Sequence, residues 1–300
     1  MKYSFMTFSC PELALDEALE AARRSGYDGL ELRISAGHAH GIEWETDAAA
    51  RRAARRRAAE RGVALCCVAT SCQLASPAHA GQMLDDAKRS INLAGDIGAA
   101  CLRVFGGKFP EEMSREEAIA ALTRSLSLLA EHAEARGVTV CLETHDAWCD
   151  PAHVAEVMRR VDQRAVGVNW DIMHPVRVAG ATVDQAFETL RPWIRHVHFH
   201  DGVTREGRLE LVPIGQGQVD HRRAVALLKA MPYEGYLSGE WINWEPYETH
   251  LPRELATMKQ YEAEAGQGEA AARPVEHEQE RVHEHEERDA GHGRVRFRRE

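Results

Sequence analysis

The feature that most constrains the fold of this 300-residue chain is a repeated alternation of two hydrophobic patterns. Short apolar runs, typical of buried strands, are each followed by a longer segment with the periodicity of a helix. The first helix, for example, is opened by Pro11 and ended by Gly26. Eight such units predict eight parallel strands, over residues 3–10, 30–34, 63–70, 100–105, 138–143, 165–170, 194–200 and 236–241.

Eight strands alternating with eight helices predict a single (β/α)8 TIM barrel of the α/β class over residues 1–265. A hydrophobic content of 44% fits one large barrel with a substantial core. From Gly266 onward the composition changes to Glu, His, Arg and Gly, so residues 266–300 are predicted to be a disordered tail. A long loop is expected over 201–217, and the helices over 11–25, 47–61, 79–97, 114–136, 151–161, 182–190, 220–231 and 252–264.

Composition limits the partners and the location of the protein. A formal net charge of -10 argues against nucleic acid or an anionic membrane as the main partner, because both bind clustered Lys and Arg. No apolar run approaches the roughly 20 residues that cross a bilayer, and the N-terminal residues lack the pattern of a signal peptide. The seven cysteines form no Cys-x-x-Cys pair, which favours reduced thiols. We therefore expect a cytoplasmic protein with a small-molecule partner, and homo-oligomerisation stays open.

The segment Ile-Arg-His-Val-His-Phe-His-Asp-Gly over 194–202 places three histidines at strand spacing. Alternate side chains of a strand share one face, so His196 and His200 point the same way as His198 between them. Taken alone, this pattern is equally typical of a polar strand face and of a metal site. Three other predicted strands end in carboxylates, and consecutive strand ends meet at the mouth of a barrel. The candidate ligands of one divalent cation are therefore Glu143, Asp171, His198 and Glu240.

The sequence around these strand ends resembles the xylose-isomerase-like family of sugar isomerases and epimerases. The resemblance spans roughly residues 3–264. It is most specific in Leu-Glu-Thr-His (142–145), Trp-Asp-Ile-Met-His (170–174), His-Val-His-Phe-His-Asp (196–201) and Gly-Glu-Trp (239–241). It implies the same four ligands, and it implies that His174 binds substrate. Three carboxylates and one imidazole favour Mn²⁺, with Mg²⁺, Co²⁺ or Zn²⁺ as alternatives.

The resemblance also suggests further substrate contacts, with one departure from the family pattern. Many members have lysine at the position of His200, so a contact made by that lysine does not carry over. Arg205 or Arg208 loosely matches the family's arginine after the seventh strand. Arg33 and Arg103, at the ends of the second and fourth strands, fit either anchors for a substrate carboxylate or phosphate or structural ion pairs. The predicted substrate-binding residues are His174, Arg33, His145, Arg205 and His200.

A site of this kind polarises a hydroxy-carbonyl substrate and stabilises an enediolate, while Glu143 and Glu240 exchange the proton as base and acid. We therefore expect a metal-dependent isomerase or epimerase of a small sugar or sugar-like hydroxy-ketone. A dehydratase of the inosose or dehydroshikimate type would use the same enolate and is the main alternative. An abasic-site endonuclease with three zinc ions is disfavoured by the acidic balance. A barrel that binds a ligand without turnover is disfavoured by the complete acid/base pair.

Overall fold

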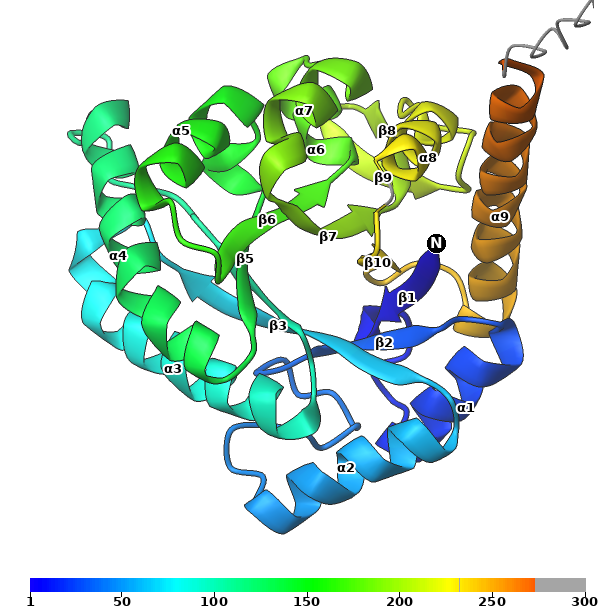
Figure 1. Cartoon of the computed structure of the whole chain (residues 1–300), viewed down its shortest axis with the longest axis horizontal. Helices are drawn as coiled ribbons and strands as arrows, with labels where there is room; N and C mark the ends of the chain where they lie inside the picture. Colours follow the sequence, from blue (N-terminus) through cyan, green and yellow to red (C-terminus); the bar gives the residue numbers. More distant parts are fainter. Residues whose placement is uncertain (232, 273–300) are drawn as a thin grey trace, which may run out of the picture.

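The computed structural model describes residues 1–231 and 233–272. Eight parallel strands close into a barrel in the order β1-β10-β7-β6-β5-β4-β3-β2, with helices around the outside (Figure 1). This arrangement confirms the predicted TIM barrel. The barrel strands are β1 (Lys2–Met6), β2 (Gly29–Arg33), β3 (Ala64–Gln73), β4 (Cys101–Phe105), β5 (Thr139–Glu143), β6 (Val166–Asp171), β7 (Ile194–Phe199) and β10 (Tyr236–Gly239).

The helices begin and end where local chemistry favours it. In the long helix α4, Ser114 accepts from the backbone N–H of Glu117, and the Glu117 carboxylate accepts from the backbone N–H of Ser114 at 2.8 Å. Gly26 ends α1 in the left-handed conformation with φ of 84°. The helices are α1 (Leu15–Ser25), α2 (Ala48–Glu60), α3 (Ala80–Ile97), α4 (Arg115–Ala135), α5 (Pro151–Val161), α6 (Met173–Ala179), α7 (Val183–Leu190), α8 (His221–Ala230) and α9 (Tyr247–Ala272).

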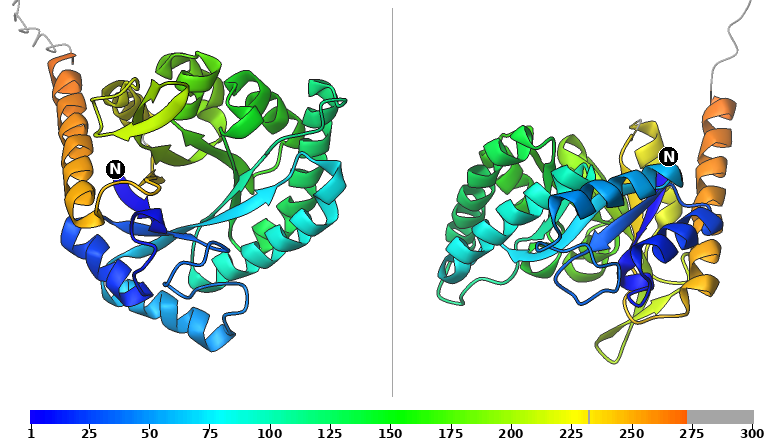
Figure 2. Two further views of the ribbon diagram at one scale, coloured as in Figure 1. Left: turned by 180° about the vertical axis from the view of Figure 1, so that it is seen from behind. Right: turned by 90° about the horizontal axis from the view of Figure 1, so that it is seen from below.

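The prediction of a long loop after the seventh barrel strand was wrong. Strands β8 (Asp201–Arg205) and β9 (Arg208–Val212) form an antiparallel hairpin there, which projects from one end of the barrel (Figure 2). Glu206 and Gly207 make its two-residue turn with φ of 49° and 75°. Positive φ at both central residues is what a tight hairpin turn requires.

Helix α9 is longer than predicted at both ends. It runs along the outside of the barrel next to α1 and α8, and Lys229 of α8 donates to the carbonyl of Glu262 at 2.9 Å (Figures 1 and 2). The Tyr3 hydroxyl also donates to the Glu262 carboxylate at 3.1 Å, which ties β1 to this helix. The helix crosses the expected boundary at residue 265 and reaches Ala272. The disorder predicted for the tail concerns residues 273–300, which lie outside the described residues.

The barrel interior is unusually polar for a buried region. Because side chains alternate along a strand, β7 directs His196 and His198 inward, while Val197 and Phe199 face the other way, where Phe199 packs against Trp241. All four of these side chains are buried. The apolar core therefore lies mainly between the strands and the helices. None of the helices within 1–231 and 233–272 combines the length and apolar character of a membrane span.

Candidate metal centre

Four buried side chains of ligand type meet inside the barrel at the C-terminal ends of its strands. Glu143 ends β5, Asp171 ends β6, His198 lies near the end of β7, and Glu240 directly follows β10. One ligand atom from each lies within 4.8 Å of the others. His198 Nδ1 is 3.2 Å from Glu143 Oε1 and 3.3 Å from Glu240 Oε2. The fold thus brings together the four residues that the sequence singled out.

The start of helix α6 holds the Asp171 carboxylate in place. Oδ1 accepts the backbone N–H groups of Met173 at 2.8 Å and His174 at 2.9 Å, as a capping side chain does. The other oxygen, Oδ2, is 2.9 Å from His200 Nε2. Burial by itself would raise the pKa of Asp171, but the neighbouring His174 and His200 lower it well below its usual range. The side chain therefore presents an ionised oxygen to the cluster.

One arginine lies against the two glutamates. Arg103 on β4 is buried, with Nε 3.1 Å from Glu143 Oε2 and Nη2 3.8 Å from Glu240 Oε1. Its guanidinium also donates to the carbonyl of Thr70 at 2.6 Å, which fixes its position. Arg103 compensates only part of the charge of three carboxylates, and a bound cation could compensate the rest in place of protons on the neighbouring histidines, since buried charges are costly unless compensated. The donor set therefore fits a divalent cation, and its oxygen-rich character favours the harder ions.

Glu240 is kept ionised by its neighbours. Burial would raise the pKa of its carboxyl group, but the charges of His198 and Arg103 outweigh burial and lower the pKa to about 2. An ionised carboxylate at this position can accept a proton.

Three of the predicted substrate-binding histidines gather beside the four ligand-type residues. The rings of His145 and His174 have their centroids 4.5 Å apart, and those of His174 and His200 are 5.6 Å apart. His174 Nε2 is 4.0 Å from Asp171 Oδ2. His200 is also anchored, because its Nδ1 lies 2.8 Å from the carbonyl oxygen of Glu240. These rings therefore lie next to one another beside the Asp171 carboxylate.

The two predicted arginines have different surroundings. Arg33 is buried at the end of β2, where it donates to the Ser71 hydroxyl and to the carbonyl of Ile34. Burial and the nearby Arg103 lower the pKa of Arg33 to about 10. Arg205 is 69% exposed on the β8–β9 hairpin, and its Nε is 3.5 Å from the carboxylate of Glu210. The structure therefore does not bring Arg205 to the buried cluster.

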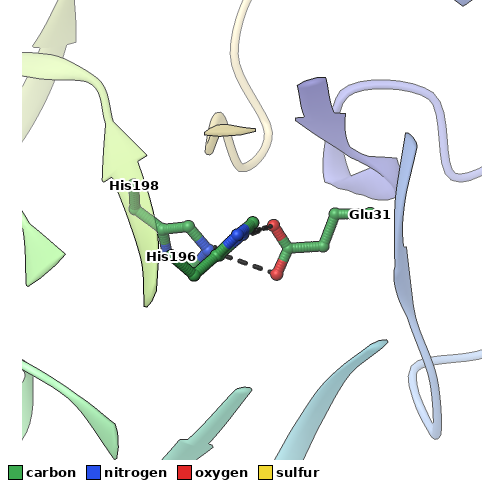
Figure 3. A group of neighbouring side chains, drawn as sticks. All are labelled: Glu31, His196 and His198. Atoms are coloured by element: carbon green, nitrogen blue, oxygen red, sulfur yellow. Dashed lines mark hydrogen bonds and ion pairs between the residues drawn. The ribbon is translucent and has the colours of Figure 1, made fainter. Parts of the chain in front are cut away.

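Sequence reasoning overlooked one buried carboxylate next to the site. Glu31 on β2 is fully buried and lies next to His196 and His198 (Figure 3). The sequence signal was a glutamate between two leucines in a strand expected to be buried, because such a carboxylate needs a partner inside the protein. For Arg103 the sequence left two roles open, an anchor for a substrate anion or a structural ion pair, and the structure pairs it with both glutamates.

Comparison with known proteins establishes the family. The model of the xylose isomerase-like TIM barrel family matches residues 19–261, so this chain belongs to that family. The 3-dehydroshikimate dehydratase of Bacillus anthracis is 24% identical over 210 residues, which cover 66% of this chain and 71% of that protein.

Solved structures of epimerases and of a dehydratase share the fold. An L-ribulose 3-epimerase superposes with a TM-score of 0.75 at 17% identity, over 93% of this chain and 100% of that one. The probable 3-DHS dehydratase of Bacillus anthracis superposes with a TM-score of 0.73 at 20% identity, over 86% and 99%. The 3-keto-D-glucoside 4-epimerase of E. coli gives a TM-score of 0.71 at 17% identity, over 87% and 99%. At these identities the likeness concerns the fold alone.

Proposed function

We propose that this protein is a metal-dependent isomerase or epimerase that acts on a small sugar or sugar-like hydroxy-ketone through an enediolate. Four buried ligand-type side chains at the C-terminal end of the barrel carry the proposal. This end of a TIM barrel is where catalytic groups are found in essentially every characterised enzyme of the fold. Membership of the xylose isomerase-like family supports the same assignment.

The residues that would hold the cation are Glu143, Asp171, His198 and Glu240. Mn²⁺ is the favoured ion, with Mg²⁺, Co²⁺ and Zn²⁺ as alternatives, because three carboxylates and one imidazole form a predominantly hard donor set. When bound, the ion supplies Lewis-acid polarisation of the substrate carbonyl and compensates the negative charge that develops on its oxygen.

Glu143 and Glu240 would move the proton. One carboxylate takes the proton from the carbon next to the carbonyl, and the electron pair of that C–H bond enters the enediolate. The other carboxylate returns a proton, either to the opposite face of the same carbon or to the former carbonyl carbon. In the second case the hydroxyl proton of the enediolate passes to the former carbonyl oxygen, and the new carbonyl forms on the carbon that lost its proton. The first outcome is epimerisation and the second is isomerisation. Both glutamates lie within 3.3 Å of His198 Nδ1, so they flank one small region, as such an exchange requires.

The histidines at the mouth would orient the substrate. His174 and His145 can donate to or accept from substrate hydroxyl groups, and His200 would act at the same border, held by Asp171 and by the carbonyl of Glu240. Arg33 would face an anionic group if the substrate carries one. A contact from Arg205 would require the hairpin to approach the mouth.

A dehydratase is the second candidate function, favoured by the sequence match to a 3-dehydroshikimate dehydratase. The same two glutamates would form the enolate of a cyclic polyol-derived ketone. The electron pair would then expel the hydroxyl group on the β-carbon as water, after protonation by the second glutamate. The two reactions share every residue named above and differ in the fate of the enolate.

One experiment separates these functions. The protein is incubated in D₂O with Mn²⁺ and a panel of ketoses and cyclic hydroxy-ketones, and each mixture is followed by NMR and ultraviolet absorbance. Solvent deuterium in a ketose, with a new isomer or epimer, supports the main proposal. An enone absorbance supports the dehydratase. Metal binding without deuterium exchange on any substrate would indicate a non-catalytic barrel. Cleavage of abasic DNA, together with about three zinc ions per chain, would indicate the endonuclease.

We further propose a cytoplasmic location and small carbohydrate-like substrates, without nucleic acid or membrane partners. The location is supported by the cysteines, which all lie within the described residues and are all free and buried. Whether the barrel assembles with further copies of itself is tested by its mass in solution.

A further inference from the structure

A buried carboxylate on the far side of His198 is not used by the proposed reaction. Glu31 comes from β2, and its side chain points across the barrel interior toward β7 (Figure 3). His198 Nε2 is 3.2 Å from both Glu31 oxygens, and His196 Nε2 is 2.9 Å from Oε2. All three side chains are at most 1% exposed. One carboxylate therefore binds two imidazoles in a region closed to solvent.

We infer that Glu31 is a positioning residue that holds the ring of His198 with the proton on Nε2, so that Nδ1 is free to bind the cation. This inference rests on the proposed metal site. Glu31 is 167 positions away from His198 in sequence, and it reaches the four-residue cluster through the His198 ring.

The proton arrangement follows from the inventory of donors and acceptors. An ionised carboxylate only accepts hydrogen bonds, so each ring nitrogen facing Glu31 must donate. Nδ1 of His198 faces carboxylates as well, 3.2 Å from Glu143 and 3.3 Å from Glu240, and the Asn169 amide is 3.1 Å away, so without a cation the ring can carry both protons. A cation bound by these carboxylates would take the place of the Nδ1 proton and leave a neutral imidazole. Glu31 then keeps the remaining proton on Nε2, as a carboxylate behind a metal-binding histidine does.

The second imidazole gives Glu31 little freedom to turn away. His196 lies two residues before His198 on the same face of β7, and its ring centroid is 5.4 Å from that of His198. Because His196 holds Oε2, the carboxylate plane stays directed at both rings. The inward-facing alternation of β7 therefore serves two functions: His198 presents a ligand atom, and His196 holds the residue that orients it.

The test is metal affinity in Glu31→Gln. A glutamine is uncharged, and its NH₂ group would replace one of the two oxygens that face His198 Nε2, so a donor would oppose a donor unless a ring changes its tautomer or loses its hydrogen bond. We expect Mn²⁺ to bind 10- to 100-fold more weakly by isothermal titration calorimetry, the usual scale for such a partner. The matched control is Glu254→Gln, a buried glutamate that accepts from the backbone of Ile214 outside this cluster. Its Mn²⁺ affinity should equal that of the parent.

A spectroscopic measurement keeps the inference testable even if Glu31→Gln folds poorly. The parent is labelled with ¹⁵N-histidine and loaded with Zn²⁺, and the His198 ring signals are identified by their loss in His198→Gln. We expect a proton on Nε2 of His198. A proton on Nδ1 in the loaded parent, or a folded Glu31→Gln with parental Mn²⁺ affinity, would overturn the inference. Failure of the proposed function would instead appear in the parent, as metal binding without turnover of any substrate.

Discussion

Replacing Glu240 by glutamine tests the central chemical claim, because this residue is assigned both metal binding and proton transfer. Glu240→Gln keeps an oxygen that can coordinate but removes the charge and the basicity. The lost charge lies beside Arg103, and Arg103 keeps its closer partner Glu143 at 3.1 Å. We therefore expect the barrel to fold normally while the two functions separate.

The magnitudes follow from what remains at the site. Two carboxylates and His198 are still available, so metal binding should be weaker but measurable. Turnover at saturating metal should fall by about 10²-fold or more, the usual scale for loss of a general base. This corresponds to about 2.7 kcal/mol in the activation free energy. Glu143→Gln should show a similar loss, because removal and return of the proton need both carboxylates.

The assay is the rate of product formation, measured at metal concentrations that saturate each variant. Glu245→Gln is the matched control, since it makes the same chemical change five residues away, where the glutamate pairs with Arg253 at 2.7 Å. If Glu240→Gln forms product at close to the parental rate, Glu240 is only a ligand. The base would then have to be sought among His174, His200 and Glu143.

Three further predictions concern the cation, the tail and pH. Asp171→Ala should bind Mn²⁺ far more weakly, while His277→Ala in the tail should match the parent; equal metal content by elemental analysis would contradict the ligand assignment. Truncation after Ala272 should leave the melting temperature and activity nearly unchanged, because α9 contacts Lys229 and Arg222 of α8 through Glu262 and Glu264, which precede the cut. Burial lowers the pKa of His250 to about 4. In the unfolded state the His250 side chain has its ordinary pKa of about 6.5, so as the pH falls the unfolded state binds this proton at a higher pH than the folded state does. The free energy of unfolding should decrease between pH 6.5 and 4, by at most about 3 kcal/mol from this residue. The measurement is the free energy of unfolding from urea denaturation at pH 7 and pH 5, and His250→Leu should show a smaller decrease than the parent. An identical pH dependence of this free energy in both proteins would refute the prediction.

Local sequence patterns determined the barrel and the membership of the four-residue cluster. Strand and helix periodicities are set by backbone geometry, so they can be read without knowing the fold. Once eight such units are recognised, closure places consecutive strand ends around one mouth. This is why Asp171 and His198 could be grouped although neither is informative alone. The hairpin after β7 was missed because its turn, Glu206-Gly207, joins two strands of only five residues, and in β8 the one large apolar residue is Val203.

Only the tertiary structure decided which groups face one another across the barrel. The contact of Glu31 with His198 spans 167 residues, and the ion pair of Arg103 with Glu143 joins β4 to β5. These contacts depend on strand register and on the width of the closed barrel, which no local pattern encodes. The same geometry leaves Arg205 exposed on a hairpin. Sequence alternation fixes which side chains point inward, while closure and register fix the atom that each of them meets.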